Sequence, residues 1–284
     1  MTKINIESMR PVRFLLSVVV LLTGCEKTVV IDTEQVETKI VIEGLVTNRE
    51  GYHYVKVSRS ADFYDSGKTP RVTDAVVTVS DDEGNTVEFS HNPNNDPDSA
   101  GFYLPSTPFS GVIGRTYTLT VIADGDEYHA VDKMYSVTSI DSLTYDVDQD
   151  EYDDPDDPGK FYEVLIYAKE PQDTKDYYLF DFYRNDSLLV ANPDEIYFSD
   201  DVALGEEING VQSPIYYAKG DVARVEAFSL SRAGYVFYSD LQKLLNNDGG
   251  MYSPPPANCR TNLTNGALGF FRVSAVDIME IKIE

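Results

Sequence analysis

The chain has 284 residues, 42% of them hydrophobic, and a formal net charge of −25 at pH 7. This hydrophobic content, with 20 Tyr and 13 Phe, is enough to build a core and excludes a disordered chain. The acidic charge argues against a nucleic-acid partner, which needs a basic surface, and against lying flat on anionic lipid.

The first 24 residues have the three parts of an export signal. They are a basic start (Lys3, Arg10, Arg13), a short apolar run (14–22) and the closing sequence Leu22-Thr23-Gly24-Cys25. The run is shorter than the roughly 20 apolar residues that span a bilayer, and it has the length of a signal-peptide core. The closing sequence resembles the lipobox of bacterial lipoproteins, which implies cleavage after Gly24 and lipid on Cys25. The alternatives are a plain signal peptide or a signal anchor with an incidental cysteine, and we favour the lipobox.

After a tether at 25–36, residues 37–139 carry the alternation and turn signals of short β-strands. The predicted strands are 39–48, 52–59, 75–80, 86–90, 101–104, 116–123 and 127–134. Turn sequences occur at 81–85 and 124–126, and 91–100 reads as a loop. This pattern predicts an Ig-like antiparallel sandwich as the N-terminal domain.

A second domain is predicted from 140 to 284. The segment 140–143 is interpreted as a junction, and the acidic run 146–157 as a solvated surface loop. Carboxylates this close also suit Ca²⁺, but the Asp-x-Asp-x-Asp-Gly loop with its distal Glu is missing. We therefore favour the solvated loop over a calcium site.

The rest of the second domain is predicted to be β-rich with one helix. Strands are expected at 161–169, 176–183, 187–191, 195–198, 215–218, 221–230, 269–274 and 275–283. Between them the period changes to that of a helix over about 231–246, capped by Ser231 and stopped by the Asn-Asp-Gly-Gly sequence at 247–250.

Few residues point to chemistry. With Cys25 lipidated, Cys259 has no disulfide partner, and we interpret it as a buried apolar residue rather than a reactive thiol. His53, His91 and His129 lack metal-ligand spacing. No nucleophile elbow, zinc-protease motif or phosphate-binding loop occurs. We therefore expect no enzyme, cofactor or metal, although carboxylates are too numerous to rule out a hydrolase with an unrecognised site.

Two further segments are candidates for binding. The second half contains seven tyrosines on or near predicted strands: Tyr162, Tyr167, Tyr177, Tyr178, Tyr183, Tyr216 and Tyr217. They suit an aromatic surface that binds sugars or a protein partner, or they suit packing within strands. We favour packing. The Asn- and Gly-rich tail at 258–269 suits tight turns, so we expect it to be structural.

Several segments together resemble one family. They are the lipobox, the KIVIEGLVTN strand, the TYTLTVIADGDEYHA hairpin, the 140–143 junction, and the tail PPAN followed by NLTNGALGFF. Their order is similar to the uncharacterised lipoproteins of Bacteroides-type bacteria grouped as domain of unknown function 4249. The tail departs from the family pattern, with one glycine at 264–266 where two are usual and Cys259 where an apolar residue is usual.

The resemblance implies a place and a partner but no catalytic residues. Such proteins resemble accessory partners of TonB-dependent outer-membrane transporters, and the first domain resembles the small sandwiches of carboxypeptidase regulatory regions. We expect a non-enzymatic outer-membrane lipoprotein, facing the periplasm or the cell surface, that assists a transporter in binding a glycan or peptide ligand. The alternative is a stand-alone glycan-binding or adhesion protein.

Overall fold

The computed structural model describes residues 38–61, 69–92, 94–152, 158–189, 196–200, 207–247 and 257–284. The predicted signal segment 1–24, Cys25, the tether 25–36 and residues 153–157 of the acidic run lie outside the described residues. The lipobox and the lipid on Cys25 therefore stay predictions.

Seven strands of the first half of the chain and one strand near its end form an eight-stranded sheet. Its strands follow the order β15-β1-β2-β5-β4-β3-β6-β7. Their bounds are β1 Ile40–Thr47, β2 Tyr54–Arg59, β3 Val76–Asp81, β4 Thr86–His91, β5 Phe102–Pro105, β6 Thr116–Ala123, β7 Asp126–Lys133 and β15 Leu268–Ser274, with a 3-10 turn at Pro97–Ser99. Buried and partly exposed residues alternate along β6, as expected of strands with one face on a core.

The two ends of this sheet approach each other. An isolated bridge joins Ala130 of β7 to Leu263, just before β15. One continuous core results, which includes Ile42, Leu119 and Phe271. Strand β15 pairs with β1 in parallel, Ile42 lying opposite Gly269. The tail of the chain therefore completes the N-terminal sheet, although the domain boundary predicted at 139/140 would assign it to the second domain.

Two smaller sheets make up the remainder. One has the order β13-β9-β8 and the other β11-β10-β14-β16, with β12 beside β10. Their bounds are β8 Ile140–Val147, β9 Lys160–Lys169, β10 Tyr177–Arg184, β11 Ser187–Leu189, β12 Phe198–Asp200, β13 Glu207–Ala218, β14 Val222–Ser229 and β16 Val276–Lys282. Side chains of both sheets, such as Ile166 and Val225, share a second core.

The residues of the predicted junction at 140–143 form the start of β8. Ile140 and Leu143 are buried, and the strand continues into the first two residues of the acidic run. Asp141 and Ser142 between them are exposed, so the strand packs through its apolar residues.

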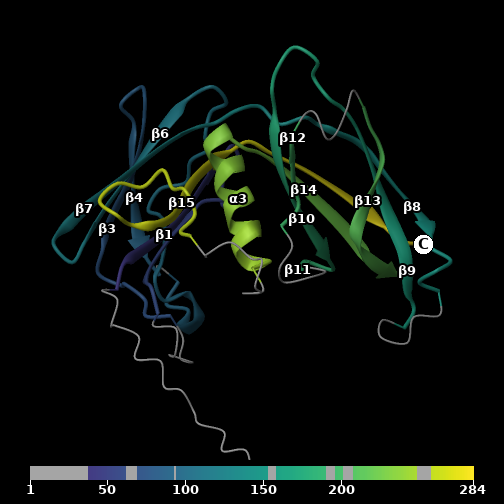
Figure 1. Ribbon diagram of the computed structural model, residues 1–284, viewed down its shortest axis with the longest axis horizontal. Coiled ribbons are helices and arrows are strands. Elements are labelled where there is room, and N and C mark those ends of the chain that lie inside the picture. Colours follow the sequence, from purple (N-terminus) through teal and green to yellow (C-terminus); the bar gives the residue numbers. More distant parts are fainter. Residues whose placement is uncertain are drawn as a thin grey trace, which may run out of the picture. The chain divides into compact units, whose positions relative to one another are not determined.

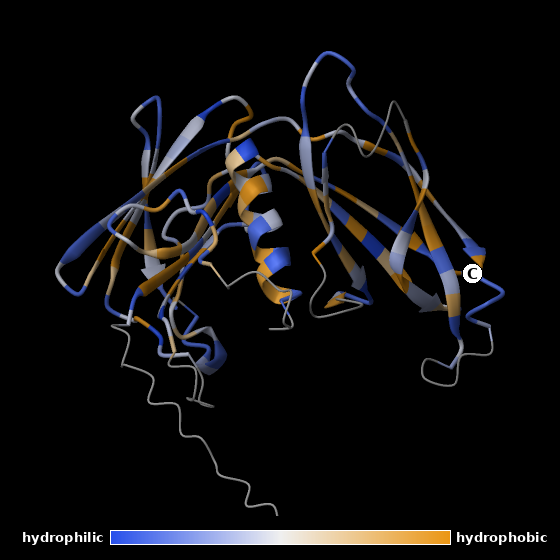
Figure 2. Ribbon diagram, viewed as in Figure 1, coloured by the Kyte–Doolittle hydropathy of each residue, from blue (hydrophilic) through white to orange (hydrophobic). Residues whose placement is uncertain are grey.

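The helix α3, Arg232–Leu245, lies beside β15 of the eight-stranded sheet and beside β10 and β12 of the second sheet (Figure 1). The Ser231 hydroxyl caps it by accepting a hydrogen bond from the Gly234 N–H at 3.1 Å, which satisfies one of its free backbone donors. Both hydrophobic and hydrophilic residues occur along the helix (Figure 2). Tyr235 and Tyr238 pack on a third apolar cluster with β10 and β14, and Phe237 stacks on Phe270 of β15 at a ring distance of 5.0 Å.

The predicted fold class is confirmed. The described chain is mainly β, with an antiparallel sandwich-like sheet first and a second β-rich part that carries one α-helix. The helix predicted at 231–246 agrees with α3 within one residue at each end.

Candidate functional site

A cavity of about 370 Å³ lies beneath α3, where the helix meets β1, β2 and β15. This volume is within the range of small-molecule pockets, which run from roughly 300 to 1,000 Å³. Its apolar walls are Val41, Phe237, Leu241, Leu244, Leu268 and Phe270, and its polar lining residues are Glu43, Tyr54, Tyr238, Asn258, Cys259 and Arg272. A largely apolar pocket with a few polar groups is the usual form of a binding site.

Arg272 is the most unusual residue of this cavity. It is only 8% exposed, and its buried Nη1 has no hydrogen-bond partner among the described residues. The guanidinium lies over the Phe228 ring at 4.5 Å and near the Tyr238 ring at 6.0 Å, so aromatic faces supply part of its stabilisation. Burial disfavours its charge, but the Coulombic effects of Tyr238 and Asp181 leave the Arg272 pKa raised overall.

A second cavity of about 250 Å³ shares Arg272 and Tyr238 with the first. Its lining also includes Asp181 and Phe180 of β10. Burial raises the pKa of Asp181, and the nearby Arg272 opposes that shift. Arg272 therefore lines both cavities, the first with largely apolar walls and the second with Asp181 among its lining residues.

Further polar groups lie buried on the same face of β10 and β14. Glu226 is opposite Asp181 in the strand register and is 1% exposed. It accepts a hydrogen bond from the Tyr52 hydroxyl at 3.3 Å, and its Oε1 lies 3.2 Å from Nε of Arg224. Burial raises the Glu226 pKa, although Arg224 opposes the shift. Because Glu226 already has these partners, we assign it a structural role: its contact with Tyr52 connects β14 to the eight-stranded sheet.

Asp132 of β7 anchors the start of α3. Its Oδ2 accepts a hydrogen bond from the Val273 N–H at 3.0 Å, and its carboxyl is also hydrogen-bonded to the Ser231 hydroxyl. Burial raises the pKa of Asp132 to about 6, although these hydrogen bonds oppose the shift. One carboxyl thus joins β7, β15 and the helix cap next to Arg272.

The Asn- and Gly-rich tail has the structural role expected for it. The Asn262 side-chain amide donates to the Phe271 carbonyl at 2.8 Å and accepts from the Phe271 N–H at 3.0 Å. Gly269 has a φ of +98°, and a Cβ there would lie 2.1 Å from the Ile42 carbonyl oxygen. The glycine is therefore required where β15 approaches β1, and the same tail also lines the cavity through Asn258 and Cys259.

The interpretation of Cys259 as a buried residue needs correction. Its side chain is a free thiol and is half-buried, because it lies on the lining of the cavity rather than inside a core. Burial still raises its pKa, which lowers its thiolate fraction and its reactivity.

The seven tyrosines of the second half do not form an exposed surface. Tyr178 and Tyr217 are fully buried, and the other five are partly buried. Tyr178 donates to Glu170 at 2.9 Å, and Tyr216 donates to Asp148 of the acidic run at 3.0 Å. The favoured interpretation, packing within strands, agrees with this burial.

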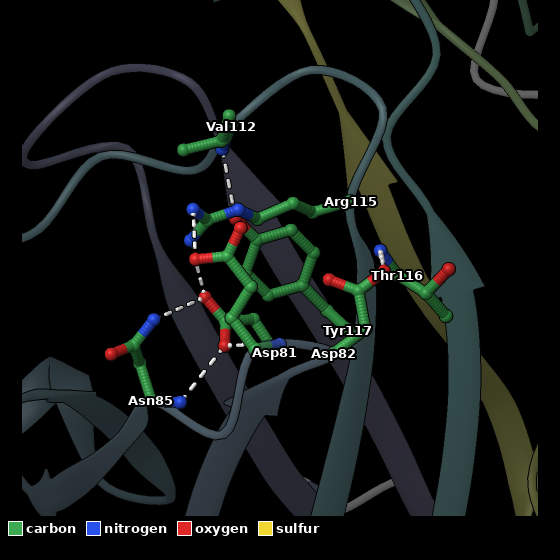
Figure 3. Close-up of polar contacts among 8 residues, drawn as sticks. Asp81, Asp82, Asn85, Val112, Arg115, Thr116 and Tyr117 are labelled. Carbon is green, nitrogen blue, oxygen red and sulfur yellow. Dashed lines mark hydrogen bonds and ion pairs between the residues drawn. The ribbon is translucent and has the colours of Figure 1, made fainter.

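A charged cluster at the β3–β4 turn is saturated by its own bonds (Figure 3). Asp81 accepts hydrogen bonds from the Asn85 backbone at 2.9 Å and side chain at 2.8 Å. Arg115 donates to Asp81 at 2.7 Å and also pairs with Glu83. These contacts fasten the turn to the start of β6, and we assign them a structural role.

The histidines, which lack metal-ligand spacing in the sequence, make structural contacts. His53 is buried, stacks on Phe109 at 4.1 Å and accepts from the Thr47 N–H at 3.1 Å. His91 accepts from the Gly101 N–H at 3.0 Å. In the part of the chain that the structure describes, no group of three or more potential metal ligands gathers. Residues 153–157 lie outside that part, so calcium binding by the acidic run stays open.

Sequence reasoning missed the central residues of the cavity. Arg272 follows Phe270 and Phe271 in a strand, and Asp181 stands between Phe180 and Phe182. A single charge inside an otherwise apolar strand is a usable signal, because such a charge is rarely buried without a partner. What brings Arg272, Tyr238 and Asp181 together is the packing of α3 across two sheets, which no local pattern contains.

Among the described residues, no helix is both long and apolar enough to cross a membrane. No curated protein matches the chain. The family model described as Domain of unknown function (DUF4249) matches residues 26–278, which is most of the chain, and the chain therefore belongs to this family.

Proposed function

We propose that this protein is a non-enzymatic outer-membrane lipoprotein that binds a small ligand and acts as an accessory partner of a TonB-dependent transporter. The observation that carries the binding role is the apolar cavity beneath α3 with Arg272 in its lining. Membrane attachment rests on the lipobox at Leu22-Thr23-Gly24-Cys25, and the transporter on the resemblance described above.

The cavity's polar groups support binding rather than catalysis. Among its described lining residues Glu43 is the single carboxylate, and it forms an ion pair with Lys56 at 2.9 Å. A hydrolase of the two-carboxylate kind needs a second acid facing the first. The half-buried thiol of Cys259 has a raised pKa, which does not suit a nucleophile.

Stand-alone glycan binding has less support. Its sequence basis is the seven tyrosines, and their full or partial burial within the strands leaves little ring surface for stacking on sugars.

The transporter role is tested by co-purification. An affinity-tagged chain is recovered from outer membranes under mild detergent, and the co-purifying proteins are identified by mass spectrometry. We expect a large TonB-dependent barrel in stoichiometric amount. The matched control is Cys25→Ser, which removes the lipid site and should release the chain from the membrane fraction. Recovery of the wild-type chain without such a barrel would contradict the transporter role.

A further inference from the structure

The Arg272 guanidinium has no ion-pair partner among the described residues. An isolated charge taken out of water costs several kcal/mol unless it is paired and hydrogen-bonded. Among the described residues, no carboxylate oxygen lies within ion-pair distance of Arg272, and its Nη1 is buried without a hydrogen-bond partner. The aromatic contacts with Phe228 and Tyr238 stabilise the charge, but they supply no acceptor oxygen for the donors of Nη1.

Of the carboxylates around Arg272, two already have hydrogen-bond partners and the third lines the second cavity. Glu43 is paired with Lys56 through both of its oxygens, at 2.9 and 3.1 Å. Asp132 accepts from the Val273 N–H and hydrogen-bonds with Ser231. Asp181 lines the second cavity rather than the one beneath α3. Arg272 thus lines the first cavity with a buried Nη1 that has no hydrogen-bond partner among the described residues.

The remainder of that cavity suits an apolar group. Phe237 and Phe270 stack on each other in its wall, and Leu241, Leu244 and Leu268 add aliphatic surface. A molecule that fills this space would gain from burial of apolar area, while a single anionic group would satisfy the arginine.

We propose that Arg272 is the anion-recognition residue of this cavity and that the ligand is an amphipathic organic anion. Its apolar body lies under α3, and its carboxylate or phosphate accepts charge-assisted hydrogen bonds from Arg272. This inference rests on the proposed ligand-binding function and specifies the class of ligand. It does not depend on the transporter, so the two are tested separately.

The test uses three probes with one shared apolar body: phenylbutyrate, phenylbutyl phosphate and the neutral phenylbutyramide. Each is titrated by calorimetry into the full chain in lipid nanodiscs, with empty nanodiscs as the blank. We expect at least one anion to bind about tenfold to a hundredfold more tightly than the amide, which is the usual strength of a hydrogen bond to a charged group. The order of the two anions distinguishes a carboxylate from a phosphate ligand.

The decisive variant is Arg272→Met, which keeps an apolar chain of similar length and removes the charge. It should lose the preference for the anion and bind anion and amide equally. Its Tm without ligand should equal or exceed that of the wild type, because an apolar residue in place of a buried charge is often neutral or stabilising. The matched control is Arg260→Gln, whose exposed guanidinium pairs with Asp240 at 2.7 Å and does not line the cavity.

Three results would overturn the proposal. They are equal affinity of the wild type for the amide and the anions, an anion preference that persists in Arg272→Met, and no binding of any probe. Equal affinity would leave ligand binding intact and remove only the role of Arg272. If Arg272→Met does not fold, the comparison of anion and amide on the wild type decides alone. Loss of binding with an intact transporter complex would separate this failure from failure of the proposed function.

Discussion

The buried carboxyl of Asp132 makes a quantitative prediction for stability against pH. Burial raises its pKa from 3.8 to about 6 in the folded chain, a difference of about 2 pKa units. Each unit corresponds to about 1.4 kcal/mol, so the carboxyl weakens the fold by about 3 kcal/mol once it is ionised. Its side chain is 7% exposed, and screening by solvent is therefore small.

The sign follows from proton binding. Between the unfolded value of 3.8 and the folded value of about 6, the folded chain holds more protons on this group than the unfolded chain. Its contribution to the free energy of unfolding is therefore complete below 3.8 and is lost as pH rises through 6. The Asp132→Asn variant stays neutral and keeps a side-chain oxygen for the Val273 N–H, so its stability should lack this decline.

The assay is urea unfolding of the wild type and Asp132→Asn over this pH range. Relative to the wild type, the variant should gain up to about 3 kcal/mol between the acidic and the neutral end. Asp126→Asn, a change at an exposed residue of the same strand, is the control and should alter the profile far less. A difference between Asp132→Asn and wild type that is constant with pH, or that grows in the opposite direction, would refute the reasoning.

Three further substitutions test the local structure by the same unfolding assay. Gly269→Ala should lower the free energy of unfolding by roughly 2–4 kcal/mol, because its Cβ would meet the β1 backbone at a left-handed φ. The control Gly266→Ala, at a φ of +72° in open space, should lower it by about 1–2 kcal/mol. Equal losses would contradict the close approach of β15 to β1. Asn262→Leu should cost roughly 1–3 kcal/mol, since it leaves the Phe271 N–H and carbonyl unpaired, and a neutral result would show that water replaces the amide. Asp81→Ala should also cost roughly 1–3 kcal/mol, because it removes the acceptor of the β3–β4 turn, and an unchanged free energy of unfolding would refute that role.

The amino-acid sequence by itself determined the elements that depend on local pattern. Alternating β-branched and polar residues predict β6, and the Asp-Gly turn after it predicts its hairpin with β7. Ser231 and the helical spacing that follows predict α3. These signals are readable because strand period, turn chemistry and helix capping act over a few neighbouring residues.

Only the tertiary structure decided which of these elements meet. The parallel pairing of β15 with β1 joins residues more than 200 positions apart, and the cavity beneath α3 exists because the helix packs against β1, β2 and β15 of the eight-stranded sheet. Cys259, expected in a core, lies on that cavity, and Arg272 became a candidate only once its burial was known. Long-range packing sets these outcomes, because burial and charge pairing depend on neighbours that are distant in the chain.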